Sequence, residues 1–134
     1  MIRHYFFCQV MDKVRILICE DNEAISTLTK FKLARVGYTH CDIAANGRIA
    51  SELVVTTNYD LVITDIQMPF VSGLELTRYI RNDLGRRTPV IILSSNTDEN
   101  TVLTGFDREI TVFLAKPVIP RELVQRVKKL LKRK

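Results

Sequence analysis

Carboxylates, a hydroxyl and an ammonium group each follow directly after a short aliphatic run in this sequence. Glu20 and Asp21 follow the first run, Asp65 follows a later one, and Ser94 and Lys116 follow two more. If the runs are parallel strands, these side chains converge at one edge of a sheet. Clustered carboxylates repel one another, so they must share protons or bind a cation. A hard divalent cation with oxygen ligands is the natural partner, and Mg²⁺ fits best.

The same residues could transfer a phosphoryl group to a carboxylate. Mg²⁺ would cancel the repulsion between Asp65 and the incoming group, and Asp65 would act as the nucleophile and become an aspartyl phosphate. Lys116 can pair with that carboxylate before transfer and with phosphoryl oxygens after it. Pro117 favours an extended backbone at Lys116, which directs the side chain out of the sheet edge. Ser94 can donate to a phosphoryl oxygen or simply cap the next helix.

The elements that must position these residues alternate between strands and helices. Short apolar runs predict five strands, at residues 14–19, 38–45, 59–64, 89–93 and 112–115. Helical spacing and caps predict five helices, from Asn22 to a left-handed stop at Gly37, from Asn46 onward, at 74–84, at 97–106 and from Pro120 onward. Such alternation implies βαβ crossovers, and therefore a doubly wound α/β fold with a mostly parallel sheet. Ligands of this fold bind beyond the carboxyl ends of the strands.

The composition indicates one globular domain. The chain has 134 residues, of which 46% are hydrophobic and 26% charged, and this suits one compact core. Much of the net charge of +5 lies from Arg121 to the C-terminus, where it suits the solvated face of a last helix. Because no nucleic-acid-binding motif accompanies these basic residues, we expect no direct binding to nucleic acid.

Cysteine usage and hydropathy point to the cytoplasm. Cys8, Cys19 and Cys41 lack the spacing of a zinc site, and an odd number of cysteines without a framework suits a reducing compartment. No run approaches the roughly 20 apolar residues that cross a bilayer, so no membrane association is expected. Residues 1–11 form an apolar N-terminal extension without a signal-cleavage site. It either packs on the domain or on a second copy, giving a homodimer, or Met11 is the natural start.

Several segments resemble the response-regulator receiver domain in order and spacing. They are ILICEDN at 16–22, DLVITDIQMP at 60–69 with GLEL at 73–76, PVIILS at 89–94 and FLAKP at 113–117. The resemblance covers about residues 12–134. It implies a flavodoxin-like, five-stranded parallel sheet in the order 2-1-3-4-5, flanked by five helices. It also implies a phosphorelay in which a sensor histidine kinase or phosphotransfer protein donates the phosphoryl group and a downstream protein is the target.

The resemblance assigns roles to individual residues. Asp65 becomes the phosphorylation site, assisted by Lys116 and Ser94. Asp21 and Asp65 supply carboxylates to Mg²⁺, Glu20 acts mainly through water, and the backbone carbonyl of Gln67 completes the metal shell. The domain would then be mainly a signalling switch that catalyses its own phosphotransfer and autodephosphorylation, and not a dedicated metabolic enzyme.

Two further pairs follow from the same resemblance. Ser94 and Phe113, where Thr and Tyr are frequent in the family, look like the switch pair: the hydroxyl moves toward the phosphoryl group and the ring follows. This would alter the face made by the fourth helix, fifth strand and fifth helix. Gln67 and Asn96 occupy places that tune how fast water removes the phosphoryl group, so we expect them to set its lifetime.

Three other functions fit these residues less well. A haloacid-dehalogenase-like phosphatase needs a second Asp two residues after the nucleophile, where this sequence has Gln67. A dinucleotide-binding domain needs a glycine-rich turn after the first strand, where Glu20 and Asp21 stand instead. A pseudo-receiver that only binds partners has no need of Asp65 and Lys116. The chain is expected to be either a stand-alone regulator or a piece of a hybrid kinase or longer regulator.

Overall fold

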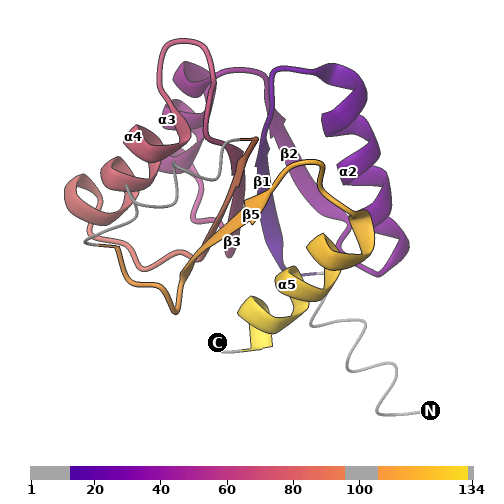
Figure 1. The fold of residues 1–134 in the computed structure, drawn as a ribbon. Helices are drawn as coiled ribbons and strands as arrows, with labels where there is room; N and C mark the ends of the chain where they lie inside the picture. The colour runs from indigo at the N-terminus through magenta and orange to yellow at the C-terminus, as the bar shows by residue number, and fades with distance from the viewer. Residues whose placement is uncertain (1–12, 96–105, 133–134) are drawn as a thin grey trace.

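A five-stranded parallel sheet forms the centre of the molecule (Figure 1). The computed structural model describes residues 13–95 and 106–132. The strand order is β2-β1-β3-β4-β5, which confirms the predicted order and fold class. The strands are β1 (Arg15–Cys19), β2 (His40–Ala44), β3 (Leu61–Asp65), β4 (Val90–Ser94) and β5 (Thr111–Ala115).

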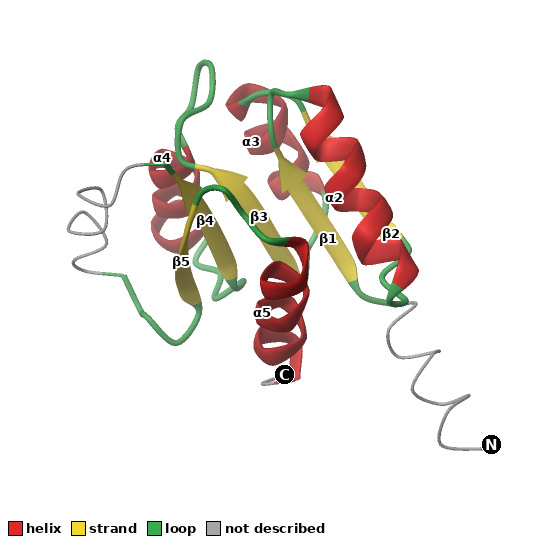
Figure 2. Ribbon diagram, turned by 45° about the vertical axis from the view of Figure 1, so that its right-hand side comes forward, coloured by secondary structure: helices red, strands yellow, loops and turns green. Residues whose placement is uncertain are grey.

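Helices cover both faces of this sheet (Figure 2). They are α2 (Glu23–Arg35), α3 (Gly47–Thr56), α4 (Gly73–Arg78) with its continuation η1 (Tyr79–Asp83), and α5 (Pro120–Lys132). One core cluster joins the sheet to α2 and α5 through Leu33 and Val127, and a second joins it to α3 and α4 through Val54 and Leu76. The predicted helix at 97–106 lies outside the described residues except for Phe106, and residues 1–11 lie outside them as well.

Side-chain caps fix where three helices begin. Asn22 accepts a hydrogen bond from the N–H of Ile25 at 3.1 Å, and Asn46 accepts one from Ile49 at 2.9 Å. Each satisfies an N–H group that has no partner inside the helix. Ser72 caps α4 in the same way. The predicted starts at Asn22 and Asn46 are confirmed, and the stop after α2 is confirmed by the φ of 105° at Gly37.

The predicted helix at 74–84 differs from the observed one. The helix begins at Gly73, and from Tyr79 onward its turns widen, so that the N–H of Leu84 donates to the carbonyl of Tyr79, five residues back. Arg81 in this wider turn donates to the carbonyl of Ile110 and to the hydroxyl of Thr111 at the start of β5. Apolar periodicity cannot reveal this change, because residues 74–84 are spaced as in an ordinary α-helix and their pattern carries no signal for a wider turn.

The apolar residues of α2 do not all face the core. Ile25, Leu28 and Phe31 have the spacing of a buried stripe, yet they are 46%, 51% and 55% exposed. Ser26 and Leu33 are the buried residues of this helix. The predicted helix is present, but much of its apolar surface remains open to solvent. None of the described helices is both long and apolar enough to cross a membrane.

Candidate functional site

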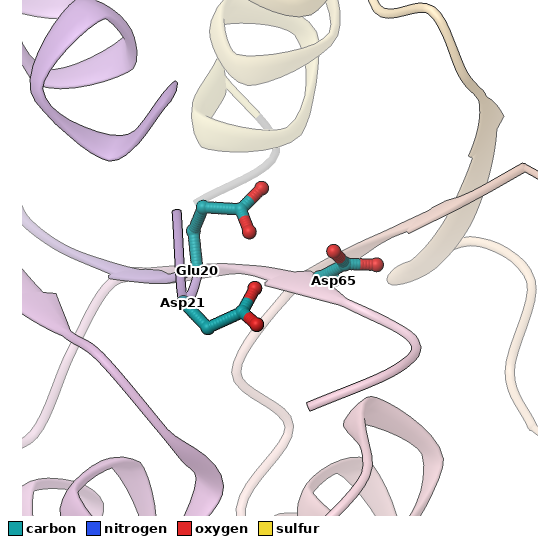
Figure 3. Close-up of side chains that lie close together, drawn as sticks. All are labelled: Glu20, Asp21 and Asp65. Atoms are coloured by element: carbon teal, nitrogen blue, oxygen red, sulfur yellow. The ribbon is translucent and has the colours of Figure 1, made fainter. Parts of the chain in front are cut away.

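Three carboxylates meet at the C-terminal edge of the sheet. Glu20 and Asp21 directly follow β1, and Asp65 is the last residue of β3, the neighbouring strand. An oxygen from each lies within 4.8 Å of the others, and Figure 3 shows the three side chains side by side. The structure therefore brings together the carboxylates that sequence reasoning expected to converge.

Lys116 reaches the same place from the end of β5. Its Nζ donates to Oδ2 of Asp65 at 2.6 Å, and the two side chains are 28% and 10% exposed. The pair is thus partly shielded from water, where a charge-assisted hydrogen bond is stronger than at an open surface. The backbone N–H of Lys116 donates to the carbonyl of Ser94 at 2.7 Å. This bond fixes the end of β5 beside the end of β4.

Glu20 is only 5% exposed, although it is acidic. Its Oε2 accepts the N–H of Asn22 at 3.3 Å, but within residues 13–95 and 106–132 its buried Oε1 has no hydrogen-bond partner. Burial raises the pKa of Glu20; the N–H of Asn22 lowers it, while Asp21 and Asp65 raise it further. A buried, unpartnered carboxylate oxygen beside two more carboxylates is a donor set that suits a hard divalent cation. Mg²⁺ therefore fits these side chains.

The remaining candidate residues surround this cluster. Ser94 ends β4 and is 1% exposed, while the N–H of Gln67 donates to Oδ1 of Asp65 at 3.4 Å. Phe113 on β5 is half-buried and pairs in register with Ile92. Because side chains alternate along a strand, Phe113 shares one face of the sheet with Ser94. Asn96 lies outside the described residues.

Gly73 is a site residue that sequence reasoning treated only as part of a loop and a motif. Its N–H donates to the carbonyl of Ile66 at 2.9 Å. A Cβ at this position would lie 2.4 Å from the backbone oxygen of Asp65, closer than real Cβ atoms approach. The first turn of α4 is therefore packed directly against the backbone of Asp65. The sequence shows that a glycine follows shortly after Met68 and Pro69, but it does not show how closely that glycine approaches the backbone of Asp65.

A family model described as the response regulator receiver domain matches residues 16–128. The chain belongs to this family. It is thus a receiver domain of the two-component response-regulator type, as its motifs predicted. The acidic cluster and Lys116 lie inside the matched region.

Curated relatives of this receiver domain include transcriptional regulators. The chain is 36% identical over 122 residues to the transcriptional regulatory protein ResD of Bacillus subtilis, covering 91% of this chain and 50% of ResD. It is 34% identical over 118 residues to the transcriptional regulatory protein SrrA of Staphylococcus aureus, covering 88% of this chain and 48% of SrrA. The chain thus spans about half the length of these relatives.

Solved structures of receiver domains have the same fold. The receiver domain of the Francisella response regulator 1452 matches with a TM-score of 0.78 at 32% identity, covering 90% of this chain and 98% of that one. The signal receiver domain of a histidine kinase from Syntrophus aciditrophicus matches with a TM-score of 0.76 at 33% identity, covering 89% and 90%. These similarities confirm the flavodoxin-like fold expected from the sequence.

Replacing Glu20 with Gln should stabilise the receiver domain at neutral pH when a chelator is present. The raised pKa of Glu20 means that the folded state favours its protonated form, so the wild type loses stability as the pH rises above about 4.5. The neutral amide of Glu20→Gln avoids that loss. We expect a gain in the free energy of unfolding at pH 7 that shrinks toward pH 4.5.

Urea unfolding with EDTA, followed by circular dichroism at several pH values, measures this gain. Glu52→Gln, at an exposed glutamate on α3, is the matched control and should change little at any pH. A Glu20→Gln gain that stays constant between pH 4.5 and 7 would contradict the electrostatic explanation.

Proposed function

We propose that this receiver domain accepts a phosphoryl group on Asp65 from a sensor histidine kinase or a phosphotransfer protein. The observation that carries the proposal is the 2.6 Å contact between Lys116 Nζ and Asp65 Oδ2, beside two carboxylates within 4.8 Å. A nucleophilic carboxylate needs a neighbouring cation that stabilises negative charge and nearby carboxylates that bind a metal ion. For Asp65 the cation is Lys116, and the nearby carboxylates are those of Glu20 and Asp21. The Asp65 side chain is 10% exposed, so part of it is accessible to a donor.

Mg²⁺ is the cofactor that these residues would hold. The carboxylates of Asp21 and Asp65 and the backbone carbonyl of Gln67 would bind it directly, with Glu20 acting mainly through water. When bound, Mg²⁺ supplies positive charge that offsets the repulsion between the carboxylate and the phosphoryl oxygens. The buried Oε1 of Glu20, which has no hydrogen-bond partner in the part of the chain that the structure describes, supports this donor set.

The protein residues then perform the transfer. A carboxylate oxygen of Asp65 bonds to phosphorus while the bond from phosphorus to the donor's imidazole nitrogen breaks, and that nitrogen keeps the electron pair. The ammonium of Lys116 passes from Asp65 Oδ2 to a phosphoryl oxygen, which keeps the new charge paired. Ser94 donates its hydroxyl hydrogen to another phosphoryl oxygen. The domain thus acts mainly as a switch that catalyses its own modification.

We propose that Ser94 and Phe113 convert this modification into a change of surface. Their places on adjacent strands, on one face of the sheet, support a coupled movement of the hydroxyl and the ring. The face that responds is made by the fourth predicted helix, β5 and α5, and it binds a downstream protein target. That predicted helix, residues 97–106, lies outside the described residues except for Phe106.

Gln67 and Asn96 are proposed to set the lifetime of the phosphoryl group. Gln67 lies two residues from Asp65 in the chain and its N–H already donates to Oδ1 of that residue. We expect Gln67→Ala and Asn96→Ala each to change the autodephosphorylation rate by about fivefold, the effect of one hydrogen bond to attacking water. Loss of the phosphoryl mass over time measures the rate, and unchanged rates in both variants would contradict the assignment.

A groove between α2 and α5 is proposed as the docking surface for the phosphodonor protein. The groove has a volume of about 550 Å³ and is lined by apolar side chains, including Leu28 and Val124, together with Lys32. It also reaches Glu20 and Lys116, so a protein seated there is next to the carboxylate that must receive the phosphoryl group. The half-exposed Leu28 of α2 supplies apolar surface for contact.

Replacing Leu28 with Glu should therefore slow transfer from a protein donor at least tenfold, because it places a charge in an apolar contact. Transfer from a small phosphodonor should not change. Val55→Glu, at an apolar residue of α3 that is 48% exposed, controls for the loss of surface hydrophobicity. Rates measured with a purified histidine kinase that phosphorylates the wild type test the surface. Equal slowing with both kinds of donor would contradict it.

The cellular setting is also a proposal. We place the domain in the cytoplasm, which is supported by the free, buried thiols of Cys19 and Cys41. We assign residues 12–134 to the receiver domain and 1–11 to an extension. The basic residues of α5 are assigned to a solvated face, without direct binding to nucleic acid.

The test of the proposed function uses a small phosphodonor such as acetyl phosphate. Intact-mass measurement should show a gain of one phosphoryl group with Mg²⁺ and no gain with EDTA. The adduct should be released by hydroxylamine, as an acyl phosphate is. No gain under any condition would favour a pseudo-receiver that only binds partners, and rapid release of free phosphate from a monoester would favour a phosphatase.

A further inference from the structure

The loop between β3 and α4, residues 66–72, contains a strained turn centred on Phe70. The N–H of Val71 donates to the carbonyl of Pro69 at 2.9 Å, and the φ of Phe70 is 73°. This is a γ-turn with a positive central φ, a rare form that a bulky side chain adopts against steric resistance. Phe70 is also 68% exposed, so burial of its ring offsets little of the strain.

The first turn of α3 holds this loop from the side. The guanidinium carbon of Arg48 lies 4.5 Å from the centre of the Phe70 ring, in a cation–π stack. The N–H of Gly47 donates to the carbonyl of Pro69 at 3.1 Å. A Cβ at Gly47 would lie 2.0 Å from the backbone oxygen of Val71, so only glycine permits this approach. Three consecutive loop residues thus contact the start of α3.

The other end of the loop is fixed to the phosphoacceptor. The N–H of Gly73 donates to the carbonyl of Ile66, and the N–H of Gln67 donates to Asp65 Oδ1. In the chain, Gln67 stands between Ile66, which accepts the bond from Gly73, and the strained turn at Phe70. The position of its backbone therefore depends on these bonds and on the turn. In Figure 2 the loop leaves β3 and rises beyond the edge of the sheet before it enters α4. Besides the Gly47 contacts to Pro69 and Val71, the Arg48–Phe70 stack is a side-chain contact that supports the loop from α3.

We infer that Arg48 and Phe70 are positioning residues for Mg²⁺, because their stack keeps the strained turn closed and thereby holds the backbone of Gln67 toward the carboxylates. The inference rests on the proposed function, since it concerns the same metal. A strained turn has a relaxed alternative, and the stack favours the strained one. Without the stack, part of the Mg²⁺ binding free energy must close the turn, so the measured affinity falls.

Isothermal titration calorimetry with MgCl₂ at constant ionic strength measures this affinity directly. Arg48→Ala should weaken Mg²⁺ binding by about two- to fivefold, the value of an exposed cation–π contact. The matched control is Arg35→Ala, because the Arg35 guanidinium lies 5.9 Å from the Phe31 ring on α2, away from the loop. Its Mg²⁺ affinity should equal that of the wild type.

A second variant distinguishes positioning from a general loss of stability. Phe70→Gly accepts a positive φ without strain, so adding it to Arg48→Ala should restore much of the lost Mg²⁺ affinity. Phe70→Trp alone keeps a ring for the stack and should bind Mg²⁺ as the wild type does. Urea unfolding without Mg²⁺ records stability in parallel.

The outcomes separate the two proposals. A wild type that fails to bind Mg²⁺ overturns the proposed function. A wild type that binds, with Arg48→Ala binding equally well, overturns the positioning role alone. A double variant that binds more weakly than Arg48→Ala also overturns it, because relief of strain would then have no benefit.

Discussion

Asp65→Asn is expected to abolish phosphorylation of the receiver domain by acetyl phosphate in the presence of Mg²⁺. The amide has nearly the shape of the carboxylate, but it lacks the charge that the proposed roles of Asp65 as nucleophile and metal ligand require. It also leaves Lys116 without its partner at 2.6 Å. Intact-mass measurement should show one added phosphoryl group in the wild type and none in the variant.

The control for this loss is Asp83→Asn, at an exposed aspartate in η1, which should be phosphorylated like the wild type. Circular dichroism should show that Asp65→Asn remains folded, because Glu20 and Asp21 then repel one fewer charge. A phosphoryl group that still appears in Asp65→Asn would move the nucleophile to Asp21 or another carboxylate.

Lys116→Ala is expected to slow phosphoryl transfer by about 10²- to 10³-fold, the effect of removing one preorganised group that stabilises developing charge. The ammonium is held ready, since its Nζ contacts Asp65 and its backbone N–H is bonded to Ser94. Little reorganisation is therefore needed when the phosphoryl oxygens arrive. The rate of mass gain at saturating Mg²⁺ and acetyl phosphate measures the effect.

Lys116→Arg tests whether charge alone is enough. It keeps the positive charge but places a planar, larger group in a partly buried position, so we expect an intermediate rate. Lys128→Ala, at an exposed lysine of α5, should leave the rate unchanged. A Lys116→Ala variant within threefold of the wild type would show that the ion pair with Asp65 is structural only.

Much of the fold could be predicted because its signals are local. Short aliphatic runs gave five strands, and Asn22 and Asn46 marked helix starts through a hydrogen bond to a backbone N–H three residues away. The parallel order then places strand ends together, so Glu20 and Asp65 meet without any need to know a side-chain conformation.

What could not be predicted depends on contacts between distant segments. The wide turn of η1 is tied to β5 through Arg81, and the strained turn at Phe70 rests on Arg48. No periodicity encodes either contact. The exposure of Leu28 could not be predicted for a related reason, because helical spacing shows that apolar residues share a side but not which side the core covers.

The bond from the Lys116 N–H to the Ser94 carbonyl, at 2.7 Å, has a mechanical consequence. It couples the main chains of the two residues that would bind a newly arrived phosphoryl group, so a displacement of one strains the bond to the other. The earliest response of the domain should therefore be a joint shift of two strand tips, transmitted through peptide groups before any side chain on the outer surface rearranges.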